Sequence, residues 1–212
     1  MSSLWGIGVM GGVFVGPEVR KVIHAASGSG PLLQRDYAGV IEGTTCSPEE
    51  LATLIRERFA DLAPQETAAF EHSDGGRSPL KVGDELKIRI GGFMPCQVRV
   101  VHVDDVSLTL RTLEGHPEAG RVSFGAGRDD AGRLTFRIRS RARSGGLLHY
   151  VGFLMMGRAM QARCWIRFIG RAADICGGRL AGPIRVSTSK VAEEPADVGG
   201  PDLPTFIHEA GH

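Results

Sequence analysis

The sequence lacks an excess of charge of one sign, clustered cysteines and a complete catalytic motif, and each absence excludes a class of function. With 25 Lys and Arg against 24 Asp and Glu, the formal net charge is +1, so no global field attracts nucleic acid or a membrane surface. The four cysteines are far apart, with no C-x-x-C pair and no histidines at zinc-finger spacing. This distribution is typical of reduced, mostly buried thiols.

No segment has the pattern of a secretory leader or a membrane span. The apolar stretch 4–15 is rich in glycine, and no basic residue precedes it, whereas a signal peptide begins with one. The longer apolar segment 147–169 contains Arg158, Arg163 and Arg167, which are costly at bilayer depth. The sequence therefore predicts a cytoplasmic protein without a membrane span.

The length of 212 residues is typical of one domain with extensions. Residues 193–204 are polar and rich in proline and glycine, as expected of a tail outside the folded unit. We expect a single α+β domain over 13–191. An N-terminal extension of 1–12 precedes it, and a polar C-terminal tail of 192–212 follows it.

Capping signals predict a helix over 48–60. Ser47 and Glu50 have the spacing of a capping box, and Pro48 takes the first helical position. Weaker patterns predict the neighbouring elements. These are a short helix over 19–26, a loop over 27–31, a strand over 36–43 and a second short helix over 65–70.

The second half of the chain predicts a sheet followed by one long helix. Alternating and β-branched residues indicate strands at 82–90, 96–103, 106–113, 120–125 and 134–140. Short connections such as Asp104-Asp105 suit antiparallel hairpins. The helix expected over 146–174 is apolar beyond a single stripe, so we expect a curved antiparallel sheet to grip it. One more strand is expected over 183–191.

Four segments resemble the signature segments of a known family: GPEVR at 16–20, SGSGPLLQRDY at 27–37, GHPEAG at 115–120 and IRSRAR at 138–143. They are similar to the uncharacterised domain-of-unknown-function family numbered nineteen-ninety, over roughly 13–191. The resemblance implies no transferable activity. The order of elements is also similar to that of START-like helix-grip proteins, which implies that the long helix lies across the sheet.

The last five residues, His208 to His212, match H-E-x-x-H, the motif that holds zinc in metalloproteases. A working site needs a third ligand and a supporting shell, and here the chain stops at the second histidine. We therefore interpret the match as a coincidence or as a place of adventitious metal capture, and expect neither a functional metal nor a cofactor.

The segment 137–143 carries arginine at every second position. In a strand this spacing places all four guanidinium groups on one face, where they can hold a phosphate, a carboxylate or a nucleic-acid backbone. The alternative is a solvated outer face paired with carboxylates such as Asp129 and Asp130. We favour that alternative over nucleic-acid binding, because the run has no aromatic residue for base stacking.

The loop at 115–120 contains two candidate catalytic residues, His116 and Glu118. They can form an acid/base pair if the loop folds over a cavity, or His116 can cap a carbonyl in a structural turn. Arg139 and His149 are further candidates, provided that the fold brings them to the same cavity.

The space between the long helix and the sheet is the expected place for a hydrophobic ligand. Candidate walls on the helix are Phe153, Met155, Met156 and Trp165, because methionine and aromatic side chains line adaptable apolar pockets as well as cores. Arg35 and Tyr37 are candidates at the cavity mouth. Three classes of function follow: a protein that binds a small apolar molecule, an enzyme of cyclase or hydrolase type, and an interaction or nucleic-acid-binding protein that uses the arginines.

Overall fold

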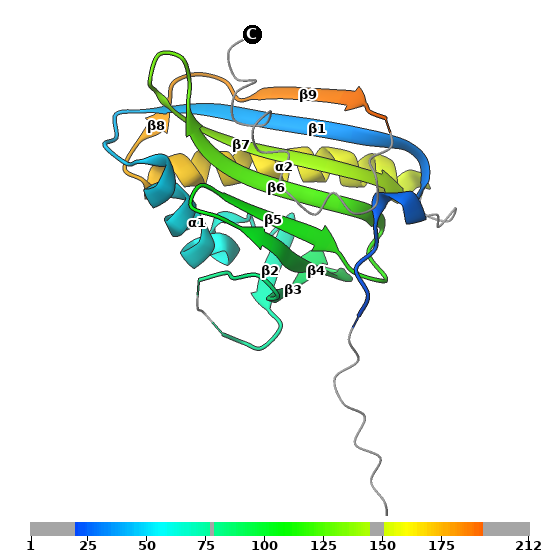
Figure 1. Cartoon of the computed structure of the whole chain (residues 1–212). Coiled ribbons are helices and arrows are strands. Elements are labelled where there is room, and N and C mark those ends of the chain that lie inside the picture. The colour runs from blue at the N-terminus through cyan, green and yellow to red at the C-terminus, as the bar shows by residue number, and fades with distance from the viewer. Residues whose placement is uncertain (1–19, 77–78, 145–150, 193–212) are drawn as a thin grey trace, which may run out of the picture.

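The computed structural model describes residues 20–76, 79–144 and 151–192, with only the backbone described at 151–158. The secondary structure of these residues consists of two α-helices, one short 3-10 helix and nine strands. In chain order they are η1 (Ala25–Ser27), β1 (Ser29–Glu42), α1 (Pro48–Leu62), β2 (Ala68–His72), β3 (Glu85–Ile90), β4 (Met94–Val103), β5 (Ser107–Thr112), β6 (Glu118–Arg128), β7 (Leu134–Ser144), α2 (Val151–Ile175), β8 (Arg179–Leu180) and β9 (Arg185–Lys190) (Figure 1).

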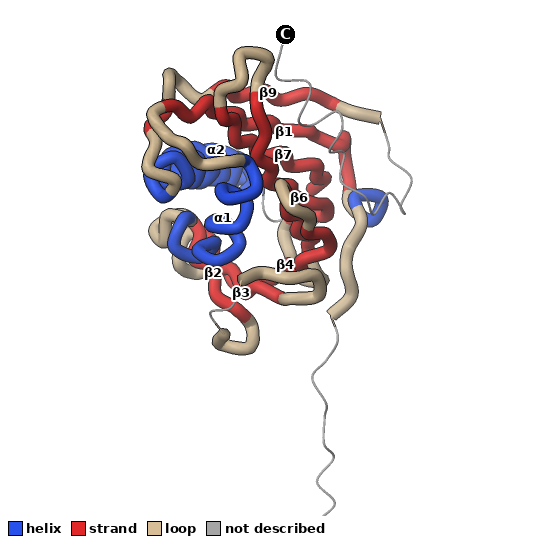
Figure 2. The backbone as a smooth tube through the Cα atoms, turned by 60° about the vertical axis from the view of Figure 1, so that its left-hand side comes forward, coloured by secondary structure: helices blue, strands red, loops and turns tan. Residues whose placement is uncertain are grey.

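The strands form one antiparallel sheet that is curved and not closed. Its order is β2-β3-β4-β5-β6-β7-β1-β8, and β9 also pairs with β1. The run from β3 to β7 is a meander of neighbours in sequence, as predicted. Figure 2 shows the sheet bent around the two helices, with α2 lying across it. The predicted α+β fold, a curved sheet that grips a long C-terminal helix, is therefore confirmed.

The first helix begins at the predicted capping box. The side chain of Ser47 accepts a hydrogen bond from the backbone N–H of Glu50 at 3.2 Å, and the carboxylate of Glu50 accepts from the N–H of Ser47 at 2.8 Å. Pro48 occupies the first turn, where its missing N–H is not needed. Because both orphan donors at this end are satisfied, the start of α1 is fixed by local chemistry.

Three local predictions are wrong. In place of the helix over 19–26, Val22 forms a bridge with Leu113, and only η1 is helical. The loop over 27–31 is instead largely the start of β1. The second short helix, over 65–70, is wrong because Ala68–His72 is strand β2, whose backbone pairs with β3.

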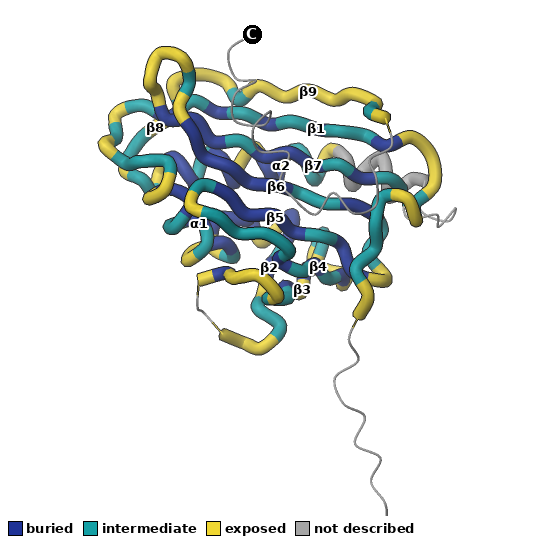
Figure 3. Tube along the Cα trace, in the orientation of Figure 1, coloured by how far each residue is buried: buried dark blue, intermediate teal, exposed yellow. Residues whose placement is uncertain are grey.

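The core lies between the sheet and the two helices. Phe59 on α1 packs edge-on against Phe124 on β6 and lies against Phe168 on α2, with ring centroids 5.0 and 5.2 Å apart. Figure 3 shows the buried residues gathered on the central strands and on the faces of the helices turned toward them. Among the residues that the structure describes, no helix is long and apolar enough to cross a membrane.

The arginines of β7 lie on the outer face of the sheet, as the alternation predicts. Ile138 and Ser140, which lie between them, are 0% and 2% exposed on the opposite face. Arg139 has a partner other than the expected ones: it donates to the carboxylate of Asp36 on β1 at 2.5 Å, and Asp129 pairs with Arg133. Arg139 is only 6% exposed, so this part of the row is buried against β1 and is not a solvated face.

Candidate functional site

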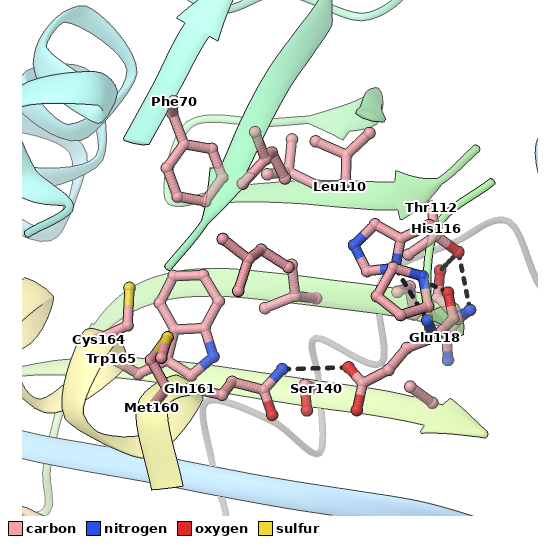
Figure 4. Close-up of a pocket in the computed structure, with 18 of the residues that line it drawn as sticks. Phe70, Leu110, Thr112, His116, Glu118, Ser140, Met160, Gln161, Cys164 and Trp165 are labelled. Carbon is pink, nitrogen blue, oxygen red and sulfur yellow. Dashed lines mark hydrogen bonds between the residues drawn. The ribbon is translucent and has the colours of Figure 1, made fainter. Parts of the chain in front are cut away.

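A cavity of about 120 Å³ lies between α2 and the inner face of the sheet (Figure 4). Its wall is mainly apolar, with side chains from five neighbouring strands. These are Phe70, Ile88, Ile90, Val98, Leu110 and Val122. Engineered apolar cavities of about 150 Å³ accept a benzene ring, so this space is close to the size of one ring.

The helix side of the cavity is built by Met160, Gln161, Cys164 and Trp165. Three of the four are apolar and face the sheet from consecutive turns of α2. The indole of Trp165 packs against the ring of Phe124 with centroids 5.4 Å apart, and against Phe70 at 6.5 Å. These contacts fix the orientation of the indole, because rotation would break the ring packing.

One end of the cavity is polar. The carboxylate of Glu118, at the start of β6, accepts from Gln161 Nε2 at 3.2 Å and from Arg35 NH1 at 3.4 Å. Arg35 also donates to Gln161 Oε1 at 3.0 Å, so the three side chains form a closed triangle. The guanidinium side chain is 7% exposed and the carboxylate side chain 20%. This network joins β1, β6 and α2 and places a compensated charge pair at the cavity end.

His116 also lines the cavity, and its ring is held by the backbone of its own loop. His116 Nδ1 lies 3.0 Å from the backbone nitrogen of Glu118 and 2.9 Å from its carbonyl oxygen, so the backbone of Glu118 holds the ring in either neutral tautomer. Burial lowers the pKa of His116, against the opposing effect of the Glu118 charge. Near neutral pH the ring is therefore uncharged, and its hydrogen-bond partner is the backbone of Glu118, whose carboxylate is turned toward Gln161 (Figure 4).

Next to this polar end, the side chain of Thr112 takes over from the backbone pairing of β5 with β6. The paired register of β5 and β6 ends at Arg111 and Arg121. One residue further, the hydroxyl of Thr112 accepts from the N–H of Gly120 at 2.9 Å and donates to its carbonyl at 3.2 Å. A side chain thus replaces the backbone ladder, which satisfies both groups of Gly120 while the strands separate.

The cysteine that lines the cavity is not activated. Burial raises the pKa of the Cys164 thiol to about 11, and Cys164 is only 3% exposed. The thiolate is the reactive form of cysteine, so this sulfur acts as a small apolar wall.

The structure brings only part of the predicted site together. His116, Glu118 and Trp165 line the cavity, and Arg35 contacts two of its lining residues. Tyr37 is buried in the core, and Arg139 lies on the outer face, away from the cavity. His149 lies outside the described residues, as do the side chains of Phe153, Met155 and Met156.

Sequence reasoning missed Gln161 and Thr112 and did not assign Ser140 to the site. The alternation in β7 did place Ser140 on the face opposite the arginines, which was the available signal. No group of three or more His, Cys, Asp or Glu side chains that could hold a metal occurs among the described residues, and the terminal His208 to His212 motif lies outside them.

The fold and its cavity define a helix-grip protein with an internal apolar space. Residues 58–171, more than half of the chain, match the family described as Domain of unknown function (DUF1990). The chain belongs to this family, as the resemblance implied. The matched range is narrower than 13–191 and includes the segments at 115–120 and 138–143. No curated protein sequence matches the chain.

Several solved structures are similar in outline. A START superfamily protein from Mycobacterium smegmatis is 11% identical, with a TM-score of 0.44 over 69% of this chain and 99% of that one. A hypothetical protein from Helicobacter pylori is 9% identical, with a TM-score of 0.43 over 65% and 86%. The di-domain ARO/CYC StfQ from the steffimycin biosynthetic pathway is 7% identical, with a TM-score of 0.47 over 68% and 50%. Identities at this level carry no information about ligand or reaction.

Proposed function

We propose that this protein binds a small, largely apolar molecule in the cavity between α2 and the sheet. The supporting observation is the cavity itself, a space of about 120 Å³ lined mainly by aliphatic and aromatic side chains. Water binds weakly to such walls, so an apolar molecule that enters and displaces it gains free energy. The polar end formed by Arg35, Glu118 and Gln161 is internally compensated, so it can border an uncharged ligand.

Ethylbenzene is a suitable probe, because it is a small apolar molecule built on a single ring. We expect isothermal titration calorimetry to give a dissociation constant below about 1 mM, equivalent to about 4 kcal/mol. Amide shifts in the NMR spectrum are expected to cluster at the residues that line the cavity.

A pair of valine variants tests the location. Val122→Phe places a ring in the cavity and is expected to abolish ethylbenzene binding, whereas Val186→Phe, at an exposed position on β9, is expected to leave it unchanged. Equal binding by both variants, or no binding by the wild type at millimolar concentration, would contradict the proposal.

A second candidate, an enzyme of cyclase or hydrolase type, is favoured by one observation: the carboxylate of Glu118 borders the cavity. The ring of His116 is held at Nδ1 by the backbone of Glu118, so an acid/base pair of His116 with the Glu118 carboxylate is not preformed. The enzyme reading predicts that wild-type protein hydrolyses 4-nitrophenyl acetate and that Glu118→Gln does not. Equal rates in both would leave binding as the function.

A further inference from the structure

Two residues that line the cavity each carry a buried polar atom without a hydrogen-bond partner among the described residues: Ser140 Oγ and Trp165 Nε1. Ser140 is 2% exposed and Trp165 is 6% exposed. A buried donor or hydroxyl normally has a partner, because leaving it without one costs most of its desolvation free energy. Two such atoms on one cavity therefore indicate a missing oxygen or nitrogen acceptor.

The two groups come from opposite sides of the cavity. Ser140 projects inward from β7, where its neighbours across the ladder are Val122 on β6 and Arg35 on β1. Trp165 projects from α2, and Figure 4 shows its ring nitrogen on the Gln161 side of the indole, away from Phe70. Ser140 thus lies beside Arg35 of the polar end, and the indole nitrogen lies on the side of Gln161, which belongs to the same end.

We infer that the ligand is an uncharged molecule whose apolar body carries a carbonyl oxygen, and that Ser140 and Trp165 donate to that oxygen; this inference rests on the proposed binding function. An indole N–H only donates and a serine hydroxyl can donate. A carbonyl oxygen has two lone pairs and accepts from both. The site is preorganised, because the aromatic contacts of Trp165 hold its N–H in place without a ligand.

The charge of the ligand follows from Glu118. A carboxylate ligand would enter next to the carboxylate of Glu118, and the guanidinium of Arg35 is already engaged by Glu118 and Gln161. Burying an unpaired charge in a largely apolar space is strongly unfavourable. A ketone, aldehyde or ester meets neither penalty.

The test compares ethylbenzene with acetophenone, which has nearly the same shape but carries a carbonyl, by titration calorimetry against wild type and two variants. Ser140→Ala and Trp165→Phe each remove one donor. Each is expected to weaken acetophenone binding about three- to tenfold relative to ethylbenzene. Benzoate, the charged analogue, is expected not to bind at millimolar concentration.

A matched control uses the other face of the same sheet. Ser123 is also buried, but its hydroxyl pairs with that of Thr109 at 2.9 Å. Ser123→Ala is expected to lower the melting temperature and to leave the ratio of the two probe affinities unchanged. Ser140→Ala without ligand is expected to melt at or above the wild-type temperature, since it removes an unsatisfied hydroxyl.

The outcomes separate the inference from the proposed function. If ethylbenzene binds but neither variant weakens acetophenone selectively, or if benzoate binds more tightly than acetophenone, the carbonyl inference is wrong and the binding function stands. If neither neutral probe binds the wild type, both are wrong. A clear loss of stability in ligand-free Ser140→Ala would show that the hydroxyl already has a partner, which also overturns the inference.

Discussion

At the scale of single residues, the burial of the His116 imidazole predicts that the stability of the fold depends on pH. Burial lowers the pKa of this ring below the ordinary value of about 6.5, so the unfolded chain takes up a proton at a higher pH than the folded protein. The stability that depends on the uncharged His116 ring is therefore fully present above about pH 6.5, and it is lost as the pH falls toward the pKa of His116 in the folded protein. We expect the free energy of unfolding of the wild type to fall more than that of His116→Gln between about pH 7.5 and about pH 5.

Urea denaturation at several pH values measures this difference directly. The two proteins share every other titrating group, so their difference isolates the imidazole. Parallel curves across the range would mean that His116 titrates alike in the folded and unfolded chains.

At the same scale, the sequence could predict only some members of the site. His116 and Glu118 stand out because a loop rich in functional groups connects two strands. Trp165 was a candidate because aromatic side chains line apolar pockets, but α2 is apolar on several sides, so the pattern did not show that Gln161, four residues earlier, faces the same space. Contacts such as that between Arg35 and Gln161 span 126 positions, and no local signal contains them.

At the scale of elements, the pairing of β1 with β7 includes a partly buried ion pair between the two strands. Asp36 accepts from Arg139 at 2.5 Å and from Gln34 at 2.7 Å, and the Arg139 side chain is 6% exposed. Removing one partner of a buried pair costs about 3–5 kcal/mol. Because Asp36 itself is 25% exposed, we expect Asp36→Asn to lower the free energy of unfolding by about 2 kcal/mol.

An exposed pair on β2 and β3 provides the control. Glu71 accepts from Arg89 at 2.7 Å, but the two side chains are 59% and 58% exposed. Exposed pairs contribute about 0–1 kcal/mol, so Glu71→Gln is expected to change stability little. Chemical denaturation of the two variants beside the wild type tests the contrast. Similar effects of both changes would show that burial does not determine the strength of the β1–β7 pair.

The elements that the sequence predicts well are those fixed by local chemistry. The capping box places the start of α1 at Pro48, and the alternation from 82 onward predicts the meander. Strand β2 was missed because its residues suit either structure, and pairing of Phe70 with Ile88 on β3 decides between them. The start of β1 was missed because Gly30 and Pro31 indicate a loop. The strand forms there because β1 as a whole pairs with both β7 and β9.

At the scale of the whole molecule, the cavity depends on parts of the chain that are far apart. Its walls come from β2 to β7 and from α2, and β1 supplies Arg35 behind them. Strand β1 pairs with β7 on one side and with β8 and β9 on the other, and all three strands come much later in the sequence. The proposed binding site therefore forms only when the sheet and the long helix have assembled together, so the proposal predicts that ligand binding depends on the folded state as a whole.

The described sheet, helices and cavity all lie within residues 20–192, which leads to a prediction about the limits of the folded unit. We propose that residues 13–191 form one domain that folds and binds without 1–12 and 192–212. The last backbone contact of the sheet, from the N–H of Val191 to the carbonyl of Leu32 at 3.1 Å, is retained in this fragment. We expect its free energy of unfolding to lie within about 0.5 kcal/mol of that of the full chain, and its affinity for ethylbenzene to be the same. Urea denaturation and titration of both proteins measure the two quantities.

A fragment that folds but no longer binds would assign part of the function to the removed segments, including the terminal His208 to His212. A fragment that fails to fold would show that the domain extends beyond these limits.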